Sequence, residues 1–164
     1  DRDQRPLFAE LGLISSHAPW TPILPVLDNW DSIGDGEIFE TWRDAGERPQ
    51  DLWRDHERVR KNFALSLDYA INVIIGYAER YVDEQTLLIV LGDHQPAPLI
   101  TGDDASRAVP VHVISGDPTL IEPFLHWGFA TGALPDTTRP ALGMDAFRDW
   151  FVRAFSTLID KSDS

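Results

Sequence analysis

The apolar run LLIVL at 87–91 leads directly into Gly92, Asp93 and His94, and this short segment constrains the fold more than any other part of the sequence. Five apolar residues without alternation predict a strand that is covered on both faces, which is typical of parallel sheets in α/β proteins. Ligand-binding and catalytic groups collect beyond the carboxyl ends of such strands. The position of Asp93 and His94 therefore indicates a functional pair.

The segments around this strand predict an α/β fold with a mostly parallel central sheet flanked by helices. Apolar residues recur every three or four positions over 55–81, which indicates a long amphipathic helix. Asp117 and Pro118 have the residue types that favour an N-cap and a first helical turn. The remaining elements that we expect are strands at 7–16 and 108–115 and helices at 117–129 and 144–159.

Length and charge restrict the domain organisation and the classes of partner. A chain of 164 residues with 43% hydrophobic content suffices for one domain with a core, so we expect a single domain over 1–160 and a frayed tail at 161–164. The net charge of -13 argues against nucleic acid or an anionic membrane surface as a partner, because phosphate binding needs clustered Lys and Arg. The sequence contains no cysteine, which excludes disulfides and thiolate metal sites.

The adjacent carboxylate and imidazole of Asp93 and His94 can both bind one divalent cation, since both groups are ordinary ligands of zinc and manganese. The alternative is that Asp93 caps the following turn while His94 forms a hydrogen bond with the backbone. The preceding buried strand, Gly92 and the rigid Pro96 and Pro98 weaken this alternative and leave both open.

His17 is a second candidate, because SSHAPW lies where the strand expected at 7–16 becomes a proline-containing loop. A structural histidine is the alternative. The loop over 17–42 is long, and long loops are often functional. Its three tryptophans either form a wall over a lipid or sugar headgroup or close the core beneath the loop; they are Trp20, Trp30 and Trp42.

The segments TLLIVLGDHQP and SSHAPW resemble the alkaline phosphatase and sulfatase superfamily, whose members carry Asp-His after a core parallel strand. The resemblance is strongest to the membrane-anchored branch, which includes lipoteichoic acid synthases and phosphoethanolamine transferases. The order of the two segments, the helix between them and the following VPVHVIS strand also match. The resemblance covers roughly residues 7–130 and implies an alkaline phosphatase-like fold.

The resemblance implies that Asp93 and His94 bind a catalytic divalent metal ion, with zinc or manganese as the first candidates and calcium or magnesium as the others. It implies that His17 binds the oxygens of a phosphate or sulfate ester, such as a lipid or envelope-glycan headgroup. The implied enzyme is a metal-dependent phosphoryl or sulfuryl hydrolase or transferase with an extracytoplasmic location. Membrane contact is expected only through an N-terminal anchor outside this chain.

The sequence also departs from the superfamily pattern. In that family the nucleophile and an earlier acidic metal ligand precede the segment that corresponds to His17, and Ser15 and Ser16 match the nucleophile poorly. The chain starts at Asp1 without an initiating Met, which predicts a processed product or an excised piece. The expectation is therefore a C-terminal portion, inactive alone, whose nucleophile is unknown and whose partner is the N-terminal half of the domain. A non-catalytic binding or structural domain on the same scaffold is the alternative.

Overall fold

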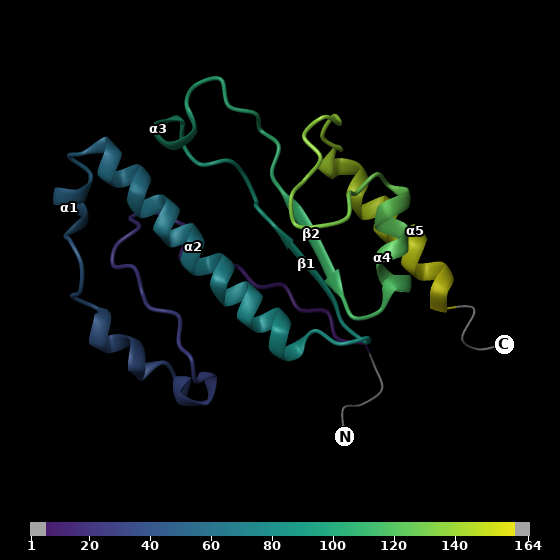
Figure 1. Ribbon diagram of the computed structural model, residues 1–164, viewed down its shortest axis with the longest axis horizontal. Coiled ribbons are helices and arrows are strands. Elements are labelled where there is room, and N and C mark those ends of the chain that lie inside the picture. Colours follow the sequence, from purple (N-terminus) through teal and green to yellow (C-terminus); the bar gives the residue numbers. More distant parts are fainter. Residues whose placement is uncertain (1–5, 160–164) are drawn as a thin grey trace. The chain divides into compact units, whose positions relative to one another are not determined.

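The computed structural model describes residues 6–159 (Figure 1). Contacts divide the chain into two compact units, and their boundary lies within one helix, between Tyr77 and Ala78. The first unit contains the chain up to Tyr77 together with Pro96–Asp104, and the second contains Ala78–Gln95 and the chain from Ala105 onward. In chain order the elements are the 3-10 helices η1 (Trp30–Ile33) and η2 (Glu37–Trp42), then α1 (Pro49–Leu52), α2 (His56–Tyr81), β1 (Leu87–Leu91), α3 (Pro98–Thr101), β2 (Val111–Ser115), α4 (Pro118–His126) and α5 (Met144–Ile159).

The sheet differs from the predicted mostly parallel α/β sheet flanked by helices, which is wrong. Within residues 6–159 the sheet consists of β1 and β2, which run antiparallel with Leu87 opposite Ser115 and Leu91 opposite Val111 (Figure 1). A parallel pair requires a crossover connection, usually a helix, whereas the link between these strands contains only the four-residue α3. The first four residues of β1 are half-buried and Leu91 is exposed, so the strand is not buried on both faces.

The strand expected at 7–16 is absent. These residues form an irregular segment with no strand partner, although the apolar composition of the segment favours a strand. The side chains of Leu7, Phe8 and Ile14 are 90%, 85% and 84% exposed. A strand requires a neighbouring strand for its backbone hydrogen bonds, and composition alone does not supply one.

The three long helices are confirmed, because their signals are local. Asp55 caps α2 through Oδ1, which accepts hydrogen bonds from the amides of Glu57 and Arg58 at 3.0 and 3.2 Å. Asp117 caps α4 in the same way, accepting from the amide of Thr119 at 2.8 Å. The predicted apolar stripe of α2 is buried only in part, with Val59 and Ala70 inside and several other members exposed; the exposed members are Leu67, Ile71 and Tyr81.

The core of the first unit is a small cluster around Trp20, Leu52 and Val59, which come from the loop after His17, from α1 and from α2. Four partly buried hydrophobic side chains pack against it: Ala18, Phe63, Leu99 and Ile100. The cluster therefore joins the loop after His17 to α1, to α2 and to α3.

The core of the second unit is built on Phe124 of α4, which is 1% exposed. Its ring lies 4.9 Å from the Trp127 ring and 5.5 Å from the Phe129 ring, and two α5 rings, Phe155 and Phe147, lie at 6.0 and 6.5 Å. The helix α4 also contacts β2. Aromatic packing therefore joins α4 to α5 next to the strand pair.

Two further observations complete the fold. None of the described helices combines the length and the apolar character needed to cross a membrane. The division into two compact units does not test the single domain expected over 1–160, which stays a prediction. The tail expected at 161–164 lies outside the described residues.

We expect the substitution Phe124→Ala to lower the free energy of unfolding by about 3–5 kcal/mol, because it removes the most enclosed ring of the aromatic cluster and leaves a cavity. Urea denaturation followed by circular dichroism measures this change. The neighbouring Leu125 is 42% exposed, so Leu125→Ala serves as the matched control, and its effect should be below about 1 kcal/mol. Equal losses for the two variants would contradict the described core.

Candidate functional site

Asp93 and His94 lie immediately beyond β1 and belong to the second unit. The backbone around them is held against the chain that precedes β2: the amide of Gly92 donates to the Pro110 carbonyl at 3.4 Å, and the side-chain amide of Gln95 donates to the Ala108 carbonyl. The Asp93 and His94 side chains are 87% and 74% exposed. The strand pair therefore fixes the backbone of the pair while both side chains remain accessible to a ligand.

The two side chains converge on each other. Asp93 Oδ2 lies 3.4 Å from His94 Nε2, and Asp93 Oδ1 accepts a hydrogen bond from the His94 amide at 2.9 Å. Two ligand atoms at about 2.1 Å from a tetrahedral zinc ion lie about 3.4 Å from each other. The observed spacing therefore fits two neighbouring positions of one zinc tetrahedron, and it is too long for a good hydrogen bond.

The ring of His94 is oriented by its other nitrogen. Nδ1 lies 2.8 Å from the Gln95 carbonyl oxygen, which can only accept a hydrogen bond, so Nδ1 carries the proton. In the neutral ring this leaves the lone pair on Nε2, the atom that faces Asp93. A backbone carbonyl on the distal nitrogen is the usual way in which proteins orient a metal-binding histidine. The backbone hydrogen bond expected under the alternative view is thus present and is compatible with metal binding.

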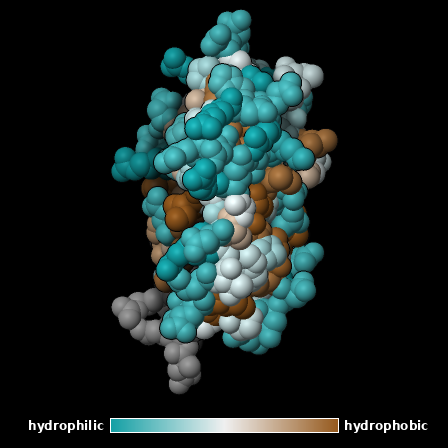
Figure 2. All heavy atoms as spheres, turned by 90° about the vertical axis from the view of Figure 1, so that its left-hand side faces the viewer, coloured by the Kyte–Doolittle hydropathy of each residue, from teal (hydrophilic) through white to brown (hydrophobic). Residues whose placement is uncertain are grey.

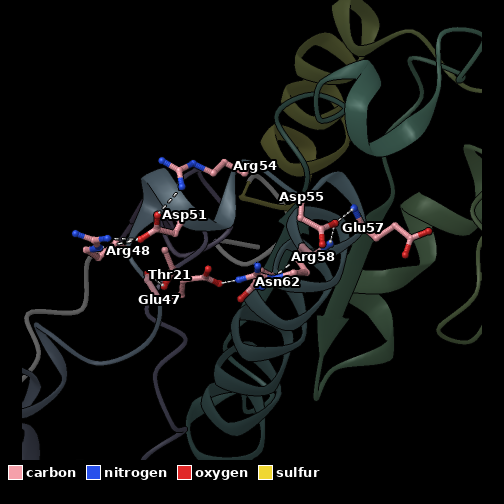
Figure 3. A network of polar contacts seen from close by, with 9 residues as sticks. All are labelled: Thr21, Glu47, Arg48, Asp51, Arg54, Asp55, Glu57, Arg58 and Asn62. Carbon is pink, nitrogen blue, oxygen red and sulfur yellow. Dashed lines mark hydrogen bonds and ion pairs between the residues drawn. The ribbon is translucent and has the colours of Figure 1, made fainter.

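A second Asp-His pair in the same chain provides an internal comparison. Asp55 and His56 stand at the start of α2, and the Asp55 carboxylate is used for capping: Oδ1 accepts from the amides of Glu57 and Arg58 (Figure 3). Asp93 begins no helix, and its described backbone partner is the next residue alone. The capping role that sequence allows for any Asp-His pair therefore applies to Asp55 and not to Asp93.

His17 belongs to the first unit and is exposed. Its Nδ1 lies 2.8 Å from the Ala18 carbonyl, and its amide donates to the Ile14 carbonyl at 3.0 Å. The carbonyl contact again places a proton on Nδ1 and leaves Nε2 outside this contact. His17 and His94 therefore share one local arrangement, in which Nδ1 donates to the carbonyl of the next residue, and they differ in that His94 Nε2 faces Asp93.

The tryptophans of the loop after His17 separate into two groups. Trp20 is 7% exposed and belongs to the core cluster, as expected if it closes the core. Trp30 and Trp42 are half-buried, and the ring of Trp42 lies 6.3 Å from that of Phe39. The proposed headgroup wall therefore does not include Trp20.

The described part of the chain contains no group of three or more His, Asp or Glu side chains arranged to hold a metal ion. Asp93 and His94 bring together two groups that could bind a metal ion, and such a pair would leave the other coordination positions open. The pKa shifts that stand out lie elsewhere. The hydrogen bond from the Thr138 hydroxyl lowers the pKa of Asp136, and burial raises the pKa of Tyr69.

Sequence reasoning overlooks Gln95. This residue orients His94 through its carbonyl and fixes the strand end through its side chain, and no pattern in the sequence predicts either role. For Trp20 the sequence left two roles open, a headgroup wall or the core, and its burial supports the core.

We expect long-range ¹H–¹⁵N spectra to show the neutral imidazole rings of His17 and His94 as Nδ1–H tautomers, because a backbone carbonyl accepts from each Nδ1. His126, an exposed histidine at the end of α4, is the reference for a ring outside this arrangement. Finding His94 as the Nε2–H tautomer would contradict the orientation described, because Nε2 could then not bind a metal ion without losing its proton.

Comparisons of the chain with known proteins were negative at every level. No protein-family model, no curated protein and no solved structure matched the sequence or the structure. The assignment of a function therefore depends on the site itself and on the two sequence segments that carry it.

Proposed function

We propose that this chain is part of a metal-dependent phosphoryl or sulfuryl hydrolase or transferase that acts on a phosphate or sulfate ester. Asp93 and His94 hold the divalent ion, and His17 binds the oxygens of the ester. The observation that carries the proposal is the 3.4 Å separation between Asp93 Oδ2 and His94 Nε2 on a backbone fixed by the strand pair. The likeness of SSHAPW and GDHQP to the alkaline phosphatase and sulfatase superfamily supports it.

The chemistry follows from the two histidine arrangements. When bound, a divalent ion lowers the pKa of a hydroxyl nucleophile and neutralises charge on the transferring group. Asp93 contributes a carboxylate oxygen and His94 contributes the Nε2 lone pair. His17 acts with its ring protonated on both nitrogens, so that Nδ1–H stays on the Ala18 carbonyl while Nε2–H donates to an ester oxygen. One local geometry thus serves a metal ligand and an anion donor.

The proposal includes a second polypeptide segment, the N-terminal half of the same domain, which would supply the nucleophile and further metal ligands. Exposed apolar surface supports this part of the proposal. Several segments of the described chain leave large hydrophobic side chains exposed.

The apolar surface lies on several segments rather than in one patch. Brown apolar residues emerge in several places between hydrophilic ones on the face drawn in Figure 2. Large exposed apolar areas in soluble proteins usually mark interaction surfaces. The residues that contribute most clearly are Leu7, Phe8, Leu11 and Ile14 before His17, and Leu65, Leu67, Ile71 and Ile75 on α2.

A non-catalytic binding or structural domain is the second candidate. The observation that favours it is the high exposure of Asp93 and His94 together with the absence of a third ligand among residues 6–159. The same exposure is expected for a half-site that another polypeptide completes, and metal binding by the pair separates the two candidates.

We expect the chain to bind one Zn²⁺, with Mn²⁺ as the second candidate, and His94→Ala to weaken binding at least about tenfold because it removes one of two converging ligands. Isothermal calorimetry measures both affinities. His56→Ala is the matched control, since His56 also follows an aspartate but that aspartate caps α2. Equal zinc affinity for the wild type and His94→Ala would contradict the metal role of the pair and favour the non-catalytic candidate.

We expect inorganic phosphate and sulfate to shift the imidazole signals of His17 and the backbone amide signals next to it, because the backbone occupies Nδ1 and leaves Nε2 to donate to an anion. NMR titration of the amide signals measures the affinity. His126→Ala should leave it unchanged, whereas His17→Ala should abolish it. An anion response of the same size in His17→Ala would remove His17 from the proposal.

A further inference from the structure

Two tryptophan side chains bind the backbone on either side of His17 and Ala18. The indole Nε1–H of Trp20 donates to the Ser16 carbonyl at 2.7 Å. The indole Nε1–H of Trp53 donates to the Pro19 carbonyl at 3.4 Å. The first bond is short and strong, and the second is near the limit of a hydrogen bond. The peptide segment that carries His17 is therefore held at both ends, all within the first unit.

The backbone of Trp20 adopts a conformation that its side chain must stabilise. Its φ is 59°, in the left-handed region, which is disfavoured for residues with a Cβ and is an outlier for a bulky side chain. Such conformations persist when the surrounding structure enforces them, and they cluster at functional sites. This residue stands three positions after His17.

The surrounding packing supplies that enforcement. The Trp20 ring stacks on the Trp53 ring with centroids 5.4 Å apart and planes 13° apart, and it meets the Phe63 ring edge-on at 5.3 Å. With Trp20 7% exposed, both geometries are favourable aromatic contacts within a buried cluster. Burial of the indole thus stabilises the left-handed backbone conformation of Trp20.

Ala18 connects this cluster with the His17 ring. Ala18 packs against the core cluster, and its carbonyl is the acceptor for His17 Nδ1 at 2.8 Å. The indoles bind the carbonyls of Ser16 and Pro19, which lie on either side of His17 and Ala18. Holding these two carbonyls fixes the segment whose Ala18 carbonyl orients the imidazole.

We propose that Trp20 and Trp53 are positioning residues for His17, which fix the carbonyl that accepts from Nδ1–H and so set the direction of the ring for anion recognition. This inference rests on the proposed function, in which His17 Nε2–H donates to a phosphate or sulfate oxygen, and it adds the residues that orient this donor. Neither tryptophan contacts the anion. A merely structural role would affect stability and leave the tautomer of His17 unchanged.

The variant Trp20→Phe tests the inference on the full chain, because phenylalanine keeps a buried ring and removes the N–H donor. We expect the His17 signals in long-range ¹H–¹⁵N spectra to change from the Nδ1–H tautomer to a mixture of tautomers. Binding of inorganic phosphate, titrated through the same signals, should weaken about fivefold, the effect of losing one oriented hydrogen bond. Trp42→Phe, the same change at a residue outside the core cluster, should alter neither quantity.

Trp53→Phe is the second variant, because Trp53 is 40% exposed and its replacement disturbs the core less. It should change the His17 tautomer in the same direction and to a smaller extent, and it decides the question if Trp20→Phe does not fold. If Trp20→Phe folds and keeps the wild-type tautomer and phosphate affinity, the inference is overturned. If Trp20→Phe does not fold, the same result for Trp53→Phe overturns it. A wild type whose His17 signals do not respond to phosphate would overturn the proposed anion role itself, which is a distinct result.

Discussion

The antiparallel pairing of β1 with β2 is the contact on which the second unit depends. Hydrogen bonding continues beyond the strands, since the Gly92 amide reaches the Pro110 carbonyl and the Gly116 amide reaches the Asp83 carbonyl at 3.0 Å. A Cβ on Gly116 would lie 2.7 Å from the Asp83 carbonyl carbon, so the approach at that end requires glycine. The strand pair is thus closed at both ends, and one of these ends presents Asp93 and His94.

In the first unit, one buried indole brings together segments that lie far apart in the sequence. Trp20 packs with Leu52 and Val59, and Leu99 and Ile100 join the same cluster. An ion pair between Glu47 and Arg58, drawn in Figure 3, links the loop before α1 to α2, and the Thr21 hydroxyl donates to the Glu47 carbonyl at 2.7 Å. The histidine loop is therefore anchored by burial at Trp20 and by polar contacts directly after it.

The local helices and strands can be predicted from the sequence, but the pairing of the strands cannot. The long helix from His56, the strand from Leu87 and the capped helix after Asp117 all carry their signals within a few residues. The direction of β2 depends on the path of the intervening chain, and the strand expected at 7–16 depends on a partner strand. Neither requirement is visible in apolar periodicity. The mostly parallel sheet is the expectation that fails for this reason.

The candidate site follows the same division. The apolar run before Gly92 indicates that Asp93 and His94 lie just beyond the end of a strand. The sequence cannot distinguish this pair from Asp55 and His56, because the difference is the set of hydrogen bonds that each aspartate accepts. The role of the Gln95 carbonyl is hidden as well, since every residue carries a carbonyl. Only the geometry separates a capping aspartate from one that faces an imidazole nitrogen.

If Asp93 and His94 form one half of a metal site, as we propose, the X-ray absorption spectrum of the zinc-loaded protein will show both residues. We expect one imidazole nitrogen and one carboxylate oxygen among the zinc ligands, at about 2.0–2.2 Å. We also expect the imidazole scattering to disappear in His94→Ala. A spectrum with oxygen ligands alone, or with imidazole scattering that persists in His94→Ala, would contradict the claim.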